Sequence, residues 1–356
     1  MREKNLDLYL LDLCLCKTKD EFIKLWKYVE LLENLDELGG RGARLVPYLI
    51  SFLKTHNIRS KHHKRLNVIN KYWWFKTNII INELKKACTL LNMINIKPLL
   101  IKGVSLYANY DKVEYRPMSD IDMLVDFKDV IPAIKELKKL GYKDSIKSVK
   151  ILQKYPRFSY EFNHHAYLFN DEKNVALELH WNINHLIDED LFQLMMNDLK
   201  EHKLIKDVLI PNVDFEFYLS IIHGYKEIHH HSNWPIDIIK LKEKNKTINK
   251  EKIIEYYKIN KNKYFFEKGV EFLENHAINT GLNINTRNFS KEDYTKNIPH
   301  PKGNSIFIRL KLFFVIAKNQ WIHINNMFFK KPFFIRVIQL FRYISFKILI
   351  KLINLH

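Results

Sequence analysis

The sequence predicts an α/β (α+β) protein with a mixed β-sheet core, helices packed against it, and helical N- and C-terminal regions. Short β-rich runs alternate with helical segments in the order β-α-β-α-β-β, while helical periodicity dominates on both sides. Only 9 glycines and 10 prolines argue against an all-β protein rich in tight turns. We divide the chain into a helical region 1–93, a core 94–185, a helical region 186–300 and a tail 301–356.

Composition places the chain among globular proteins. Hydrophobic residues make up 47% of the 356 positions and aromatic residues 13%, which is enough for a sizeable core. The cysteines, Cys14, Cys16 and Cys88, are too few for a disulfide framework and fit a reduced cytosol. Acids interrupt the apolar stretches of the N-terminus, and no run approaches the roughly 18 apolar residues of a spanning helix. We therefore expect a cytoplasmic protein, either soluble or peripheral at a membrane.

The N-terminal region carries one clear helix start. Thr18 and Glu21 have the spacing of a capping box and precede an apolar-periodic segment. The sequence "GGRG" at 39–42 ends the helical segment that follows. Because no strand precedes these glycines and no Lys-Ser/Thr follows them, a helix-linking loop is favoured over a phosphate-binding loop.

The core begins with "INIKPLLIKG", a short strand that ends in a turn at Gly103. A helical stretch "VSLYANY" follows, and then the strand "SDIDMLVDF". Residues 128–140 have the pattern of an amphipathic helix closed by Gly141. The segments "RFSYEFNHHAYLFN" and "VALELHW" read as two strands joined by a turn at "DEKN".

Two aspartates mark the second strand. Asp120 and Asp122 are two residues apart, so they project from one face, while Ile121 and Met123 project from the other. Adjacent carboxylates repel and resist burial unless a cation lies between them, which favours a hard divalent ion over the alternative of a solvated strand face. Glu178 in "VALELHW" supplies a third acid if its strand is adjacent. Three such carboxylates can hold two metal ions for phosphoryl chemistry.

The turn before this strand predicts an anion site. Gly103 allows a backbone to approach a phosphate, and Ser105 lies at a helix start, where N–H groups and the helix dipole favour an anion. Lys102 and Arg116 add positive charge.

These motifs in their order resemble a known family. "LIKGVSLYANY", "EYRPMSDIDMLV", "LKKLGY" and "LELHWNI", followed by "HGYKEIHHHSNWPIDIIKL", are similar to the uncharacterised bacterial nucleotidyltransferase family of the DNA polymerase β-like superfamily. The resemblance covers about residues 45–245 and implies a nucleotidyltransferase-type sheet. One position departs from the superfamily: Val104 stands where its second turn residue is usually Gly or Ser, and Ser105 follows one place later.

The resemblance implies a transferase that moves a nucleoside monophosphate from an NTP, such as ATP, to an unidentified acceptor. Asp120, Asp122 and Glu178 would be the catalytic and metal-binding residues for Mg²⁺ or Mn²⁺. The nucleotide-binding residues would be Lys102, Gly103, Ser105, Arg116 and His180. Two alternatives stay open: an inactive nucleotide- or partner-binding module, and a tRNA-modifying or toxin-type enzyme. Removal of Asp120 or Asp122 is expected to abolish transfer and to leave stability equal or higher.

Other polar residues admit two interpretations each. His180 shares the face of Glu178 and either lines the site or is a hydrogen-bonded core histidine. One of His164 and His165 must face the same side. The run 229–231 of three histidines cannot share one helix face, which favours an exposed or loop position over a metal site. Asp237 either pairs with a cation such as Arg116 or caps a helix.

The tail is basic and amphipathic. After Asp293 the chain has no Asp or Glu, and its Lys and Arg residues alternate with Phe, Ile, Leu and Trp. Such segments either bind a membrane surface or pack on the domain with a solvated basic face. A nucleic-acid partner is a further alternative that the sequence does not favour.

Overall fold

A computed structural model gives the fold of the chain. It describes residues 6–282, with gaps at 34, 36–37, 111–115, 145–148, 150–151, 154–155, 157–158, 161–162, 184–186, 228–232, 246–247 and 261–262. The histidine run 229–231 and the basic tail 301–356 lie outside the described residues. Within the described part, no helix has the length and apolar character needed to cross a membrane.

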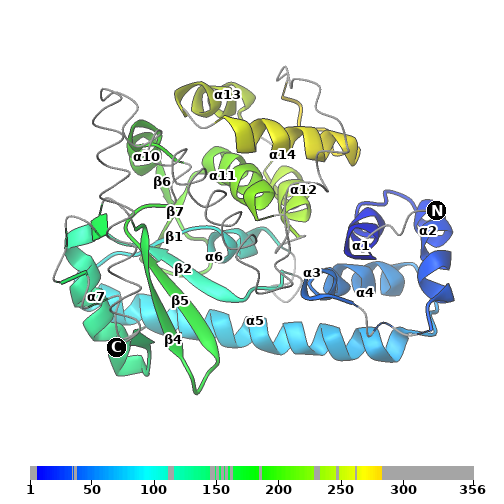
Figure 1. The fold of residues 1–356 in the computed structure, drawn as a ribbon, viewed down its shortest axis with the longest axis horizontal. Coiled ribbons are helices and arrows are strands. Elements are labelled where there is room, and N and C mark those ends of the chain that lie inside the picture. Colours follow the sequence, from blue (N-terminus) through cyan, green and yellow to red (C-terminus); the bar gives the residue numbers. More distant parts are fainter. Residues whose placement is uncertain are drawn as a thin grey trace, which may run out of the picture.

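Helices form the N-terminal region, as predicted. Their bounds are α1 Leu6–Cys14, α2 Lys19–Leu31, α3 Gly40–Ala43, α4 Val46–Thr55 and α5 His63–Asn92. Thr18 caps α2, since its hydroxyl accepts the N–H of Glu21 at 3.2 Å. The predicted loop at 39–42 becomes the single turn α3. The 30-residue helix α5 runs under the sheet, with α1 to α4 grouped at one end of it (Figure 1).

The core is a seven-stranded mixed sheet with the order β3-β4-β5-β2-β1-β7-β6. The strands are β1 Leu99–Leu100, β2 Asp120–Leu124, β3 Lys143–Asp144, β4 His165–Asn170, β5 Val175–His180, β6 Leu199–Glu201 and β7 Leu209–Pro211. The central pair β2 and β5 is parallel, and β4 and β5 form an antiparallel hairpin. The short helix α6 Gly103–Leu106 follows β1 directly. The predicted mixed sheet is thus confirmed.

Three strand predictions need correction. The hairpin of β6 and β7 lies in a region that the sequence predicts to be helical, and β7 joins the sheet by parallel pairing with β1. The two-residue strand β3 pairs with β4 at the far edge and was also not predicted. The strand expected from Arg157 onward begins only at His165, because described residues before it, such as Ser159 and Tyr160, are helical.

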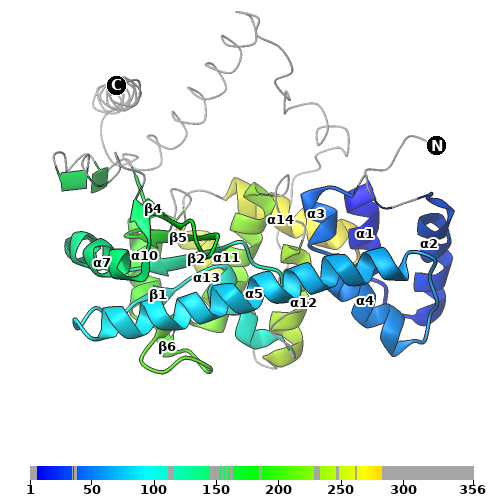
Figure 2. The ribbon, with the colours of Figure 1, turned by 90° about the horizontal axis from the view of Figure 1, so that it is seen from below.

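Apolar side chains on the two faces of the sheet belong to two separate cores. Ile121 and Met123 of β2, with Leu177 and Leu179 of β5, are buried against α5 and α7 Val130–Leu137. Gly141 ends the turn after α7 with a left-handed φ of 87°, as predicted for this helix end. Figure 2, seen from below, shows α5 lying across this face.

The second core joins the N-terminal helices to the C-terminal ones. Its helices after β5 are α10 Glu189–Met196, α11 Val213–Lys226, α12 Trp234–Lys244, α13 Lys250–Ile259 and α14 Tyr264–Asn275. Leu124 reaches this core from β2, on the face opposite to Ile121. Most of α11 is buried, so packing fixes the position of this helix. One side of α11 faces the polar side chains of β2 and β5.

Candidate active site

The parallel pairing of β2 and β5 brings carboxylates together. Asp122 is the register partner of Glu178, and both project from the face opposite to Ile121 and Leu177. Asp120 projects from the same face two residues earlier, beside Ala176. The alternation that the sequence predicts for both strands is therefore present in the structure.

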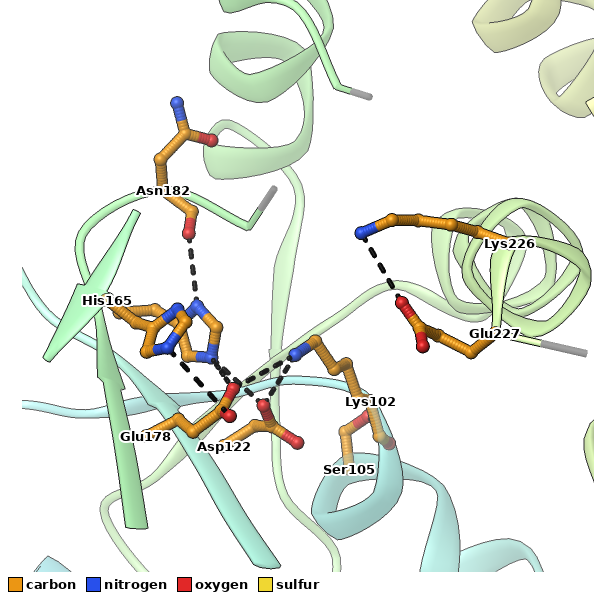
Figure 3. Close-up of polar contacts among 9 residues, drawn as sticks. Lys102, Ser105, Asp122, His165, Glu178, Asn182, Lys226 and Glu227 are labelled. Atoms are coloured by element: carbon orange, nitrogen blue, oxygen red, sulfur yellow. Dashed lines mark hydrogen bonds and ion pairs between the residues drawn. The ribbon is translucent and has the colours of Figure 1, made fainter. Parts of the chain in front are cut away.

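Lys102 lies between two of these acids. Its Nζ is 2.6 Å from Oδ1 of Asp122 and 3.5 Å from Oε2 of Glu178 (Figure 3). Burial by itself would lower the pKa of Lys102, but the two carboxylates outweigh it and raise that pKa. Burial would likewise raise the pKa of Asp122, yet the charge of Lys102 and the hydrogen bond of His180 hold it well below its usual range.

The backbone at Lys102 is unusual for a residue with a side chain. Its φ is 58° and its ψ is −128°, at the turn between β1 and α6. Non-glycine residues adopt such a conformation only when the surrounding structure imposes it, and they do so most often at functional sites. In this turn the ammonium of Lys102 lies against Asp122 and Glu178 of the sheet.

His180 contacts the same carboxylates and is fully buried. Its Nε2 is 2.9 Å from Oδ1 of Asp122 and 3.2 Å from Oε2 of Glu178. Its Nδ1 is 3.3 Å from the carbonyl oxygen of Asn182 (Figure 3). Ligand atoms of Asp122, Glu178 and His180 all lie within 4.8 Å of one another.

Of the three acids, Asp120 is the one whose negative charge is least compensated by nearby cations. It lines the same pocket, but it belongs to neither of the two groups of closely spaced metal-ligand side chains among the described residues. Burial, followed by the charges of Asp122 and Glu178, raises the pKa of Asp120 to about 6. Lys102 offsets this only in part.

The two neighbouring histidines also reach this group. His165 of β4 is the register partner of His180 of β5, and their rings lie 5.1 Å apart. The ring of His164 lies 5.6 Å from that of His180. Burial, and then the charge of His180, lowers the pKa of His165 to about 4. His165 Nε2 lies 3.9 Å from Glu178 Oε1. Both histidines therefore border the site.

The remaining predicted site residues form the turn beside the acids. A Cβ on Gly103 would meet Nη1 of Arg116 at 2.9 Å, so the glycine makes room for this guanidinium. Ser105 Oγ donates to the carbonyl oxygen of Lys102 at 2.9 Å. Arg116 is buried and donates from Nε and Nη2 to both carboxylate oxygens of Asp237, at 2.8 and 2.9 Å. Of the two interpretations of Asp237, pairing with Arg116 is the one that the structure shows.

The pocket encloses about 390 Å³ between the sheet, α6, α11 and α12. Glu216 and Arg44 are among the charged lining residues that were not predicted. Glu216 is buried beside Ser105, and burial raises the pKa of its carboxyl to about 7. A signal for it exists in the sequence, since Glu216 stands between two phenylalanines inside the apolar helix α11. Arg44 follows the glycine-rich turn α3 and carries no comparable signal.

A mixed sheet with two aspartates on one strand, a glutamate on its parallel neighbour and an adjoining strand-turn-helix is the arrangement of a nucleotidyltransferase. The chain belongs to the uncharacterised nucleotidyltransferase family, whose model matches residues 41–270, more than half of the chain. The match includes the whole of the predicted site and most of the C-terminal helices. A search of curated proteins found no match.

Proposed function

We propose that the chain transfers a nucleoside monophosphate from an NTP to an acceptor hydroxyl, in the presence of Mg²⁺ or Mn²⁺. The observation that carries this proposal is the convergence of Asp122, Glu178 and His180 within 4.8 Å, with Asp120 on the same face of β2. Membership of the nucleotidyltransferase family supports the same reaction class.

The residues present fit a divalent cation. In the free protein Nε2–H of His180 donates to Asp122, a hydrogen bond that lowers the pKa of that acid. In the other neutral tautomer an Nδ1–H is donated to the carbonyl of Asn182, and the Nε2 lone pair can then ligate a cation between Asp122 and Glu178, as is common for a metal-bound histidine. A divalent ion bound here would neutralise phosphate charge and lower the pKa of a bound hydroxyl.

The protein groups have separate roles in this proposal. Asp120, Asp122 and Glu178 would hold the cation. Lys102, which balances Asp122 in the free protein, exchanges this partner for phosphate oxygens of the NTP.

The turn beside Lys102 completes the phosphate site. Gly103 and Ser105 offer the N-terminal N–H groups of α6 to the same phosphates. Arg116 keeps this turn in place through its contact at Gly103 and its ion pair with Asp237.

The transfer itself is an in-line displacement. A bond forms between the acceptor oxygen and the α-phosphorus, the bond from that phosphorus to the bridging oxygen of the β-phosphate breaks, and pyrophosphate leaves with the electron pair. The hydroxyl proton passes to solvent at the pocket mouth. The rate enhancement comes from positioning and charge neutralisation.

The test uses the full chain, cell extract and each of the four NTPs labelled at the α-phosphate, with Mg²⁺ or Mn²⁺. We expect label from at least one NTP to become covalently attached to a component of the extract. Asp122→Ala should abolish labelling, whereas Asp126→Ala, an exposed acid just beyond β2, should retain it. If the wild-type chain binds nucleotide but no label is transferred under any condition, the alternative of a non-catalytic binding module replaces this proposal.

The tail supports a second contact, with a membrane surface. Its basic residues and lack of acids after Asp293 are suited to anionic lipid, to which each basic residue contributes about 1 kcal/mol. Sedimentation with anionic and neutral vesicles tests this: binding only to anionic vesicles, weakened by salt, is expected. Equal binding to both kinds, or to neither, contradicts it and leaves the tail as part of the fold.

A further inference from the structure

A second groove adjoins the catalytic pocket. It has a volume of about 830 Å³ and lies between the turn α3 and the first half of α5, which are neighbours in Figure 1. Arg41, Arg44 and Arg65 line it, together with Tyr72 and Trp73. Arg44 lines both the groove and the catalytic pocket, so the two spaces meet at this side chain.

Arg44 has the surroundings of an anion ligand. Its guanidinium lies 5.0 Å from the ring centre of Trp73, and burial lowers its pKa. Among the described residues, no carboxylate lies within ion-pair distance of Arg44, and the acid that most strongly offsets this burial is Asp120 of the catalytic pocket. A largely buried guanidinium that lacks a carboxylate is costly unless a ligand supplies the negative charge.

The groove as a whole is positive. Asp7 is its one acidic lining residue among those described, and its carboxylate is already engaged, accepting from the backbone N–H of Gly42 at 3.0 Å and from Nε of Arg41 at 3.2 Å. The basic tail is a poor occupant for such a groove, because it offers no carboxylate after Asp293. Charge complementarity therefore selects an anionic ligand from outside the chain.

The groove also presents a planar ring to solvent. The side chain of Tyr72 is 58% exposed and that of Val68, one helical turn earlier, is 60% exposed. Phe75, 61% exposed, continues this row along α5. An exposed aromatic ring beside arginines is the arrangement on which the bases of a single strand stack while the phosphates contact the cations.

We propose that this groove is the acceptor site and that the acceptor is the end of a single-stranded nucleic acid. Phosphates of the strand contact Arg44 and Arg65, a base stacks on Tyr72, and the terminal hydroxyl is directed past Arg44 to Asp120. This inference rests on the proposed transfer reaction, in which that hydroxyl oxygen bonds to the α-phosphorus of the NTP and pyrophosphate leaves.

The test measures binding of a fluorescein-labelled, ten-nucleotide single-stranded RNA to the full chain by anisotropy, over a series of salt concentrations. Tyr72→Ala should weaken binding about 5- to 150-fold, the range for loss of one stacked base. Arg65→Ala should reduce the slope of log affinity against log salt by about one. Arg44→Gln should also weaken binding. If the Arg44→Gln protein does not fold, Tyr72→Ala, a substitution at an exposed residue, still tests the proposal. Lys71→Ala, which removes an exposed charge of α5 outside the groove, is the matched control and should bind as the wild type does.

A parallel titration with Mg²⁺–ATP separates this inference from the proposed function. Tyr72→Ala should bind Mg²⁺–ATP as tightly as the wild type, whereas Asp122→Ala should lose Mg²⁺–ATP binding and keep the RNA. Wild-type RNA affinity in Tyr72→Ala overturns the inference, as does an equal loss in Lys71→Ala. Loss of Mg²⁺–ATP binding in Tyr72→Ala or Arg65→Ala, which line only the groove, also overturns it, since the groove would then belong to the NTP. RNA binding that depends on Tyr72, in a protein that transfers no label, supports the strand-binding groove and refutes only the transfer reaction.

Discussion

Arg116 and Asp237 form a buried, two-point ion pair that joins the segment before β2 to helix α12. Nε and Nη2 of the arginine lie 2.8 and 2.9 Å from the two carboxylate oxygens. Tyr110 donates its hydroxyl to the same carboxylate, and burial followed by the charge of Asp237 raises the pKa of this tyrosine. Since Arg116 also contacts Gly103, the pair couples the position of α12 to the turn that carries Lys102.

Asp237→Ala is expected to lower the free energy of unfolding by roughly 3–5 kcal/mol, because it leaves a buried guanidinium without its carboxylate. Tyr110→Phe removes only one hydrogen bond to that carboxylate and should cost about 1–3 kcal/mol. Urea unfolding monitored by tryptophan fluorescence measures both. Glu243→Ala, which removes a half-exposed acid of the same helix, should change stability by less than about 1 kcal/mol. An Asp237→Ala protein as stable as this control would contradict the role given to the pair.

Asp120 and Asp122 should respond oppositely to neutralisation in the metal-free protein. At pH 8 in EDTA, Asp120→Asn is expected to raise the free energy of unfolding by about 1–3 kcal/mol, since the pKa of Asp120, about 6, shows that its charge is unfavourable in the fold. Asp122→Asn should lower it, because Lys102 and His180 would lose the carboxylate that they share. The sequence-based expectation of equal or higher stability thus holds for Asp120 and is revised for Asp122.

The pH dependence of stability checks the effect predicted for Asp120→Asn. A raised pKa means that the folded protein binds a proton at Asp120 more tightly than the unfolded chain does. Above pH 6 the ionised Asp120 therefore lowers the free energy of unfolding by its full amount, and this loss disappears as the pH falls toward 4. The gain from Asp120→Asn should shrink over the same window. An equal gain at pH 8 and pH 4.5 would show that its origin is not this charge.

Metal binding should appear as thermal stabilisation. Mn²⁺ or Mg²⁺ at a hundred times its dissociation constant should stabilise the wild-type protein by about 2.7 kcal/mol, if the ion binds only the folded state. Asp122→Ala and Glu178→Ala should lose this stabilisation. Asp126→Ala, an exposed acid near the same strand, should keep it. A melting temperature that rises equally in all of these proteins would indicate binding elsewhere.

Local patterns explain how much of this site could be predicted. The alternation along a strand is a property of the pleat, so Asp120 and Asp122 could be assigned to one face from the sequence, whereas Glu178 joins them only because β5 is the parallel neighbour of β2. The strand-turn-helix at Lys102 was equally local. The match of the family model confirms the resemblance that these motifs indicated.

Contacts set by distant parts of the chain could not be predicted. Strands β6 and β7 have three residues each, and β7 belongs to the sheet because Leu209 pairs with Leu99. Arg44 reaches the pocket from the turn after α3, which no periodicity indicates. The bond from His180 to Asp122 likewise depends on the register between two strands.

His202 should make stability fall in mild acid. This buried imidazole accepts the N–H groups of Leu204 and Ile205 at Nδ1, each at 3.1 Å, and burial lowers its pKa to about 4. The unfolded chain, with a pKa near 6.5, binds a proton more readily, so stability is complete above pH 6.5 and declines as pH falls toward 4. The free energy of unfolding should fall by roughly 3 kcal/mol at most over this pH range.

Asn in place of His202 tests this dependence, because an amide oxygen can accept the same N–H groups without titrating. His202→Asn should flatten the decline between pH 6.5 and 4, measured by urea unfolding across that range. His56→Asn, at a partly buried histidine on the C-cap of α4, is the control. If the His202→Asn protein kept the wild-type slope, the acid sensitivity would have to come from other groups.

Lys102 combines a strained backbone with an ion pair, and two substitutions separate them. Lys102→Ala and Lys102→Gly both remove the ammonium from Asp122 and Glu178, so both should abolish nucleotide transfer. Only glycine adopts a φ of 58° with a ψ of −128° without steric cost. The glycine variant should therefore be more stable than the alanine variant by about 1–3 kcal/mol. Urea unfolding of the two proteins measures this difference directly, and equal stability would mean that the turn relaxes once the ion pair is gone, so that the pair itself imposes the conformation.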